Sequence, residues 1–203
     1  MTLRIGIFGG TFDPVHVGHL VAAVNARHSL GLDKVLLVVA NEPWQKTGER
    51  PVTPAADRLE LVAAAVSDSE GIEASDLEIR RGGPSYTADT VQELAQRYAG
   101  EDPELFVIVG ADVVSGISTW ERIEEVASLA TLVVVNRPGA DVVDVATNPH
   151  LSSFRSLSIE VPALEISSTD LRDRAATGRP LDFLIPAPAI RVIRERGLYA
   201  VAR

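Results

Sequence analysis

GGTFDPVHVGHL, residues 9–20, decides the fold, because it joins an apolar run to the start of a predicted helix. The apolar run Ile5–Phe8 before it is typical of a buried strand, and Leu20–Val24 after it is typical of a helix. A strand, a glycine turn and a helix in this order place free backbone N–H groups and the positive end of a helix dipole at the turn. Such a helix start binds anions, so the stretch predicts a phosphate or carboxylate site.

His16 and His19 flank Gly18 in this stretch, and Gly9 and Gly10 would let a ligand approach the backbone closely. Two histidines three apart are also typical of a solvated helix start or a structural metal pair, so the pair alone is ambiguous. The chain contains no Gly-Lys-Ser/Thr, no Gly-x-Gly-x-x-Gly and no His-Glu-x-x-His motif. These absences exclude a Walker P-loop, a dinucleotide fingerprint and a zinc-protease site.

Composition restricts the class of protein further. The 203 residues, 46% of them hydrophobic and 23% charged, predict a single domain over residues 1–203. No apolar run approaches the roughly 20 residues of a membrane helix, and no signal peptide is visible. The chain has no cysteine and a net charge of −9, which argues against disulfides, thiolate metal sites, nucleic acid and anionic membranes. We expect a cytoplasmic protein with no nucleic-acid or membrane partner, whose oligomeric state stays open, a homodimer included.

Strand-like and helix-like segments alternate along the chain. The pattern predicts strands at Arg4–Phe8, Val35–Ala40, Leu77–Arg80, Leu105–Val109, Thr131–Val135 and Ser158–Val161, and helices at Gly18–Leu30, Pro54–Val66, Thr87–Tyr98, Trp120–Ala127, Ser168–Thr177 and Ala187–Arg196. This alternation predicts an α/β fold with a doubly wound, mostly parallel sheet. Sites in such sheets lie beyond the carboxyl ends of the strands, which here carry the loops Gly9–Val17, Asn41–Pro51, Gly110–Thr119 and Val161–Ser168.

A second pattern is ISSTDLR, residues 166–172. Ser167 and Ser168 are residue types that cap a helix N-terminus, and Arg172 lies within one turn of the cap. A capped helix with a surface arginine explains the segment equally well when it is taken alone.

Residues 9–20 and 166–172 together resemble the two signatures of the HxGH nucleotidyltransferase superfamily. The fuller form GGTFDPxHxGH resembles the bacterial nicotinate-nucleotide adenylyltransferases, and the resemblance runs from Arg4 to Tyr199. It implies a Rossmann-like nucleotidyltransferase fold that transfers the adenylyl group of ATP to nicotinate mononucleotide in NAD biosynthesis. The products would be nicotinate adenine dinucleotide and pyrophosphate, and Mg²⁺ would enter with ATP rather than on a metal site of the protein.

The resemblance also implies roles for individual residues. Catalytic roles fall on His16, His19, Arg172 and Lys46. ATP would be bound by Gly9, Gly10, Thr11, Phe12, His16, Gly18, His19, Gly110, Asp112, Ile166, Ser167, Ser168 and Arg172. The nucleotide substrate would be bound by Asn41, Trp44, Lys46, Ser85, Tyr86, Thr87, Asp112, Trp120 and Glu121.

Two of the substrate segments have specific implied contacts. One is Gly110-Ala111-Asp112 followed by Trp120. The resemblance implies that Asp112 binds nucleotide hydroxyls and that Trp120 stacks on the pyridine ring. The family often has an aromatic residue next, where this chain has Glu121. A frequent turn and a core tryptophan would also explain the pattern.

SYTADT, residues 85–90, resembles the loop that binds the pyridine substrate, although a capped helix after a turn also explains it. Free N–H groups from Thr87 onward would favour a carboxylate over a neutral amide. In loop Asn41–Pro51, Lys46 matches a basic residue near the phosphates, and Trp44 is a packed anchor or a lid residue.

Two alternatives stay open. One is another adenylyl- or cytidylyltransferase of the same superfamily, such as phosphopantetheine adenylyltransferase, whose chains are usually shorter and lack the SYTxDT and GAD…W pair. The other is a non-catalytic nucleotide-binding protein, which the presence of His16, His19 and Arg172 disfavours.

Overall fold

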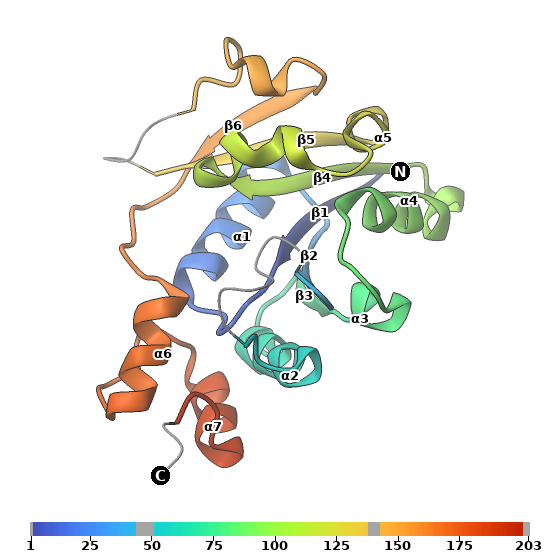
Figure 1. The fold of residues 1–203 in the computed structure, drawn as a ribbon. Helices are drawn as coiled ribbons and strands as arrows, with labels where there is room; N and C mark the ends of the chain where they lie inside the picture. The colour runs from blue at the N-terminus through green and yellow to red at the C-terminus, as the bar shows by residue number, and fades with distance from the viewer. Residues whose placement is uncertain (1, 44–50, 138–142, 201–203) are drawn as a thin grey trace.

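A six-stranded parallel sheet in the order β3-β2-β1-β4-β5-β6 forms the centre of the computed structural model, which describes residues 2–43, 51–137 and 143–200. The elements are β1 (Leu3–Gly10), α1 (Val17–Leu30), β2 (Lys34–Val39), α2 (Ala55–Val66), β3 (Ile72–Ser75), α3 (Leu77–Arg81), α4 (Thr87–Arg97), η2 (Ala99–Glu101), β4 (Pro103–Gly110), η3 (Ala111–Thr119), α5 (Ile123–Leu129), β5 (Ala130–Asn136), η4 (Pro149–Leu151), β6 (Ser156–Glu160), α6 (Ser168–Thr177) and α7 (Ala187–Arg196). This is the strand order of a doubly wound Rossmann-like fold, so the predicted fold class is confirmed (Figure 1).

The strand order reverses between β1 and β4, which lie side by side in the middle of the sheet (Figure 1). Connections from β1 lead toward β2 and β3, whereas those from β4 lead toward β5 and β6. A crevice therefore opens beyond the carboxyl ends of these two strands, where doubly wound sheets bind their ligands. Two predicted site segments, residues 9–20 and 110–120, leave the sheet at this point.

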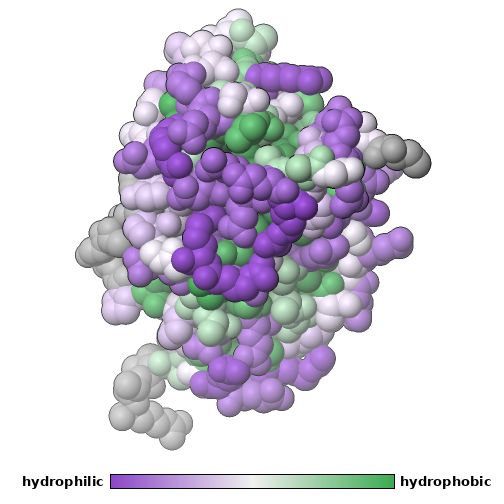
Figure 2. Space-filling view, turned by 90° about the vertical axis from the view of Figure 1, so that its right-hand side faces the viewer, coloured by the Kyte–Doolittle hydropathy of each residue, from purple (hydrophilic) through white to green (hydrophobic). Residues whose placement is uncertain are grey.

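Helices cover both faces of the sheet, and successive residues of a strand enter opposite apolar layers. In β2, Val35 and Leu37 face the layer with α1, α2, α6 and α7, while Leu36 and Val38 face the layer with α3, α4 and α5. Burial on both faces explains why the central strands are continuously apolar. The face on the side of α3 and α4 is largely hydrophilic at its surface, with hydrophobic residues visible in the hollows (Figure 2).

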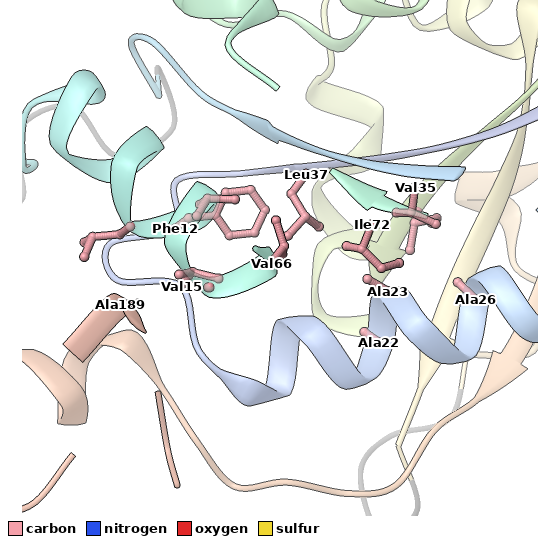
Figure 3. Close-up of a cluster of buried hydrophobic side chains, with 14 of the residues drawn as sticks. Phe12, Val15, Ala22, Ala23, Ala26, Val35, Leu37, Val66, Ile72 and Ala189 are labelled. Atoms are coloured by element: carbon pink, nitrogen blue, oxygen red, sulfur yellow. The ribbon is translucent and has the colours of Figure 1, made fainter. Parts of the chain in front are cut away.

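Small side chains bring α1 close to the sheet. Ala22, Ala23 and Ala26 are almost fully buried and face the layer that contains Val35 and Ile72 (Figure 3). Close packing of this kind fixes the height of α1 above the sheet, because protein interiors leave few voids. The N-terminus of α1, which carries the two histidines, is thereby fixed relative to the end of β1.

Two predicted elements were wrong. The predicted strand Leu77–Arg80 is the helix α3, and the third strand is the preceding segment Ile72–Ser75. Alternation of apolar and polar residues over only four positions does not separate a strand from a helical turn. Leu77 packs into the apolar layer and Glu78 is drawn inward by a hydrogen bond from Thr90, so both faces of this turn are satisfied as a helix.

The predicted helix Trp120–Ala127 begins later, at Ile123, and ends at Leu129. Trp120 instead ends η3, the 3₁₀ helix that occupies the predicted loop after β4. Arg122 has a φ of 52°, so the backbone is left-handed just before α5 and separates the two helical segments. The remaining predicted helices and strands agree with the structure to within about two residues. None of the described helices is both long and apolar enough to cross a membrane.

Candidate functional site

A cavity of about 260 Å³ opens beyond the carboxyl ends of β1 and β4. Its walls come from the ends of these strands, the start of the loop after β1, the turn before α4 and the end of η3. Of the predicted site residues, the cavity is lined by Gly9, Gly10, Thr11, Ser85, Tyr86, Thr87, Gly110, Trp120 and Glu121. Residues from four separate parts of the chain therefore meet at the position that the fold predicts.

The histidine turn, residues 11–19, runs from the end of β1 into α1. His16 occupies the N-cap position of α1, and its backbone N–H donates to Nδ1 of His19 at 3.2 Å. A ring nitrogen that accepts a hydrogen bond carries no proton, so the neutral His19 ring has its proton on Nε2. The hydrogen bond thus fixes His19 as a donor through Nε2.

The two imidazole rings stack, with their centroids 3.8 Å apart and their planes at 32°. The ring of Phe12 meets His19 edge-on at 5.1 Å, which supports its other side. His16 is 5% exposed, and burial together with the nearby Arg137 guanidinium lowers its pKa to about 4. His16 is therefore neutral at pH 7, and the stacked pair avoids placing two cations in contact.

His16 Nδ1 faces the backbone N–H of His19 in the arrangement of a capping box, but it is buried and no well-formed hydrogen bond reaches it within the described chain. Arg137 directly follows β5 at the carboxyl edge of the sheet, and its charge adds to the effect of burial in lowering the pKa of His16. The sequence interpretation missed Arg137, although its position directly after a buried strand was a signal.

The glycines of the histidine motif have distinct physical reasons. A Cβ on Gly18 would lie 3.0 Å from Nδ1 of His16, and a Cβ on Gly10 would lie 2.8 Å from the ring of Phe12. Gly18 and Gly10 therefore make room for neighbouring side chains of the protein. Gly9 and Gly10 both line the cavity, and a Cβ on Gly9 would meet nothing within 4 Å, so the close approach of a ligand to these glycines stays a prediction.

The second predicted pattern packs directly on the histidine turn. Ser167 is the N-cap of α6, and its Oγ accepts from the backbone N–H of Asp170 at 3.2 Å. The Oγ of Ser168 donates to the carbonyl of Pro14 at 2.9 Å, so Ser168 is not the cap. Arg172 donates to the carbonyl of Asp13 at 2.8 Å. The fold thus brings two segments 154 to 159 residues apart in sequence into contact.

Other predicted residues lie beside the cavity rather than in its wall. Asp112 is exposed, and its carboxylate folds back over Gly110, where an added Cβ would be only 2.4 Å from Oδ1. Gly110 is therefore required for the conformation of Asp112. Ile166 packs against the apolar layer, as a support for α6. Trp44 and Lys46 lie outside the described residues.

The serine turn, residues 83–87, is connected to the end of β2 through Asn41. The backbone N–H of Asn41 donates to Oγ of Ser85 at 2.8 Å, and its side-chain amide donates to the carbonyl of Gly83 at 3.0 Å. Ser85 in turn donates its backbone N–H to the carbonyl of Glu42 at 3.1 Å. Asn41 therefore orients the turn, and Thr87 begins α4 with its early N–H groups near the cavity.

A buried polar network beneath the serine turn was missed by the sequence interpretation. Glu78 is 7% exposed and lines the cavity, and its Oε1 accepts from Oγ1 of Thr90 at 2.5 Å. Arg81 donates to the same hydroxyl at 2.9 Å. Burial raises the pKa of Glu78, while hydrogen bonds from Ser85 and Thr90 and the charge of Arg81 oppose this. The sequence feature that could have indicated this network is Thr90, a polar residue on the apolar face of a predicted helix.

Arg58 in α2 was also missed. It is 1% exposed and donates to three backbone carbonyls, those of Thr53 at 2.7 Å, Thr11 at 2.7 Å and Asn41 at 3.2 Å. Burial lowers the pKa of Arg58, and the nearby carboxylate of Asp13 opposes this. One guanidinium therefore ties the histidine turn to the segment that orients the serine turn. An arginine in an amphipathic helix gives no sequence signal of such a role.

Three comparisons place these features among known proteins. The family model described as cytidylyltransferase-like matches residues 7–174. A probable nicotinate-nucleotide adenylyltransferase of Corynebacterium kroppenstedtii is 44% identical over 196 residues, covering 97% of this chain and 90% of that protein. Another, of Desulfitobacterium hafniense, is 43% identical over 207 residues and covers 98% and 96%.

Among solved structures, Plasmodium falciparum nicotinic acid mononucleotide adenylyltransferase complexed with NaAD matches with a TM-score of 0.78. The match covers 97% of each chain at 18% identity. A putative nicotinate-nucleotide adenylyltransferase from Vibrio parahaemolyticus matches with a TM-score of 0.70 at 19% identity. At such identities the structures support the fold, whereas the sequence relatives identify the family.

Proposed function

Because the chain belongs to the cytidylyltransferase-like family and, within it, to the nicotinate-nucleotide adenylyltransferases, we propose that its cavity and histidine turn together transfer the adenylyl group of ATP to nicotinate mononucleotide. The activity, a step of NAD biosynthesis, follows from the family. The assignment of individual residues is our proposal. The observation that carries it is the contact of Ser168 and Arg172 with the histidine turn, whose first residue, Thr11, lines the cavity.

The reaction is an in-line displacement at phosphorus. An oxygen of the 5′-phosphate of nicotinate mononucleotide bonds to the α-phosphorus of ATP, and the bond from that phosphorus to the bridging oxygen breaks. Pyrophosphate leaves with the electron pair, and nicotinate adenine dinucleotide remains. The attacking phosphate is already ionised at pH 7, so positioning and charge stabilisation must supply the rate rather than a strong base.

The histidine turn supplies donors for this step. His19 would donate from Nε2 to the phosphate oxygens that gain charge, because the bond at Nδ1 fixes that tautomer. The uncharged His16 would support the His19 ring by stacking. The early backbone N–H groups of α1 add the positive end of a helix dipole. Lys46 and Arg172 would balance the charge of the leaving pyrophosphate.

The other walls of the cavity would hold the pyridine end of the substrate. Trp120 lines the cavity and offers its indole for stacking, and the N-terminus of α4 at Thr87 offers N–H groups to a carboxylate. Asp112 would reach nucleotide hydroxyls from its exposed position. Glu121 lines the cavity where relatives often have an aromatic residue, so the stacking would rest on Trp120.

Mg²⁺ is the expected companion of ATP. No group of three or more His, Asp or Glu side chains suited to a metal ion occurs in the parts of the chain that the structure describes. We propose that Mg²⁺ binds together with ATP and is held mainly by phosphate oxygens and water, as it usually is in such sites. Bound in this way, it would neutralise charge on the leaving pyrophosphate. We also propose the cytoplasm as the place of action.

A pyrophosphate-release assay with ATP and several acceptors tests the proposal. Nicotinate mononucleotide should support turnover, whereas phosphopantetheine should not. Turnover with phosphopantetheine alone would instead support the other superfamily activity. Nucleotide binding without any pyrophosphate release would support a non-catalytic binding protein.

A further inference from the structure

The end of the chain reaches back to the histidine turn through Tyr199. The phenol of Tyr199 donates to Oδ1 of Asp13 at 2.9 Å, across 186 residues of sequence. Asp13 is 2% exposed and lies three residues before His16. We propose that Tyr199 is a positioning residue, which acts through Asp13 to hold the histidine turn in its reactive geometry. This inference rests on the proposed function.

The placement of Tyr199 is fixed by the packing of α7 on α2. Arg196, at the end of α7, forms an ion pair with Asp57 of α2 at 2.7 Å and a second one with Glu60. Gly197 then adopts a φ of 62°, and the N–H of Leu198 bonds to the carbonyl of Ile193 at 3.0 Å, which ends the helix in a tight turn. The chain is thereby turned back, so that the Tyr199 ring packs against the apolar layer under the turn.

Asp13 is the point at which several distant segments meet. Its backbone carbonyl accepts from Arg172 of α6, and its Oδ2 lies 3.5 Å from the backbone nitrogen of Thr53. The adjacent carbonyl of Pro14 accepts from Ser168. The phenol of Tyr199 adds a neutral donor from the C-terminal segment on the Oδ1 side of the carboxylate. It therefore sets the rotation of the Asp13 side chain between two cationic neighbours.

The charges near Asp13 show why this rotation matters. Burial lowers the pKa of Arg58, and the carboxylate of Asp13 opposes this. Burial and the same carboxylate raise the pKa of Tyr199, and the charge of Arg172 opposes that rise. Asp13 thus lies within electrostatic reach of both guanidinium groups. Without the phenol, the carboxylate would turn toward a guanidinium, and the turn that carries His16 and His19 would shift with it. A displacement of about 1 Å in a reacting group is enough to lower a rate strongly.

The test compares Tyr199→Phe with the wild-type chain under saturating ATP, nicotinate mononucleotide and Mg²⁺. We expect kcat to fall about tenfold while both KM values change by less than about twofold, because an interaction used only in the transition state lowers kcat alone. The matched control is Tyr98→Phe. It removes a phenol that accepts from Lys34 at 2.9 Å, and Lys34 is the first residue of β2, at the amino end of the strand and away from the cavity. The control should keep its kcat within about twofold.

A double-mutant cycle with Asp13→Asn separates positioning from general stability. If Tyr199 acts through Asp13, the effect of Tyr199→Phe should shrink to less than about threefold in the Asp13→Asn background. Rates are measured at least ~15 °C below the melting temperature of each variant, several times the shift of about 2–4 °C that a loss of ~1 kcal/mol causes in a chain of this length. An unchanged kcat in Tyr199→Phe, or an equal tenfold loss in both backgrounds, would overturn the inference. An inactive wild-type chain would instead refute the proposed function.

Discussion

The histidine turn reaches the cavity at Thr11 and the serine turn lines it from Ser85 to Thr87, and the two turns are held by contacts that differ in range and in kind. Donors to the histidine turn come from Ser168 and Arg172, which are 154 and 159 residues away from their acceptors. The network beneath the serine turn joins Glu78, Arg81 and Thr90, which are at most 12 residues apart. The serine turn above this network is bonded to Asn41, 42 to 44 residues away. Both turns thus depend on the tertiary fold, but the histidine turn is held across most of the chain, whereas the serine turn combines contacts of medium range with a local network.

The hydrogen bonds around the two turns also differ in the groups that accept them. Around the histidine turn, cationic and hydroxyl side chains donate to backbone carbonyls, so they fix the path of the chain. Beneath the serine turn, a carboxylate, a hydroxyl and a guanidinium bond to one another, so they fix charge in the cavity wall. Together with the proposed function, this difference leads us to expect that changes at the histidine turn alter turnover and that changes at the serine turn alter the choice of substrate.

The largest expected effect is that of His19→Ala, which removes a donor to the reacting phosphates. Loss of one such donor lowers kcat by roughly 10²–10³-fold, and KM should change little. His28→Ala is the matched control, since His28 is exposed at the other end of the same helix. Steady-state kinetics of both variants make the test, and near-normal turnover of His19→Ala would remove His19 from the mechanism.

The next effect concerns the serine turn and the choice between an acid and an amide. The N-terminus of α4 offers N–H donors to a carboxylate, and charge-assisted hydrogen bonds are about twice as strong as neutral ones. An amide would also leave donors unpaired, at a cost of about 1–3 kcal/mol. We expect kcat/KM for nicotinate mononucleotide to exceed that for the nicotinamide form by at least ~10²-fold, since 1.4 kcal/mol is tenfold. Equal values would exclude the role assigned to Thr87.

A third effect is the pH dependence that His16 gives to stability. Its pKa is lowered to about 4 from 6.5, so the unfolded chain binds the proton more readily. Stability from this group is complete above pH 6.5 and is lost as the pH falls toward 4. Between pH 7 and 5 the loss should be about 2 kcal/mol. Urea unfolding at both pH values measures it, and His16→Gln should show a loss smaller by that amount.

The same contrast explains how much could be predicted from the sequence. The fold class and the position of the cavity beyond the carboxyl ends of the strands followed from alternating apolar segments, because buried parallel strands and amphipathic helices have periodic patterns. The pairing of residues 9–20 with residues 166–172 was expected only from the resemblance, since no local pattern specifies a contact over 154 residues. No sequence pattern marks Arg58 as a site residue, because its role depends on the backbone carbonyls of Thr11, Asn41 and Thr53, which the fold brings to it.

Errors arose where a local pattern was too short to decide. Leu77–Arg80 alternates like a strand but lies in the helix α3, where Glu78 accepts a hydrogen bond from Thr90 of the next helix. Gly10 was assigned to ligand approach alone, and the contact that a Cβ there would make with the ring of Phe12, at 2.8 Å, was not foreseen. In both cases the deciding neighbour was close in sequence, but its side-chain direction was not readable from residue types.

The smallest expected effect tests whether charge in the wall of the serine turn tunes the choice of substrate. Glu78→Gln keeps the size of the side chain and an acceptor for Thr90, but it removes a negative charge that lines the cavity. An anionic pyridine ligand should gain from this removal, although the nearby Arg81 guanidinium reduces the gain. At pH 8 we expect KM for nicotinate mononucleotide to fall about threefold, equal to ~0.7 kcal/mol, with kcat unchanged. Glu93→Gln is the matched control, because Glu93 pairs with the same Arg81 at 3.3 Å but does not line the cavity. If KM rose equally for the acid and the amide nucleotide, Glu78 would be a support for the shape of the turn rather than a determinant of its charge.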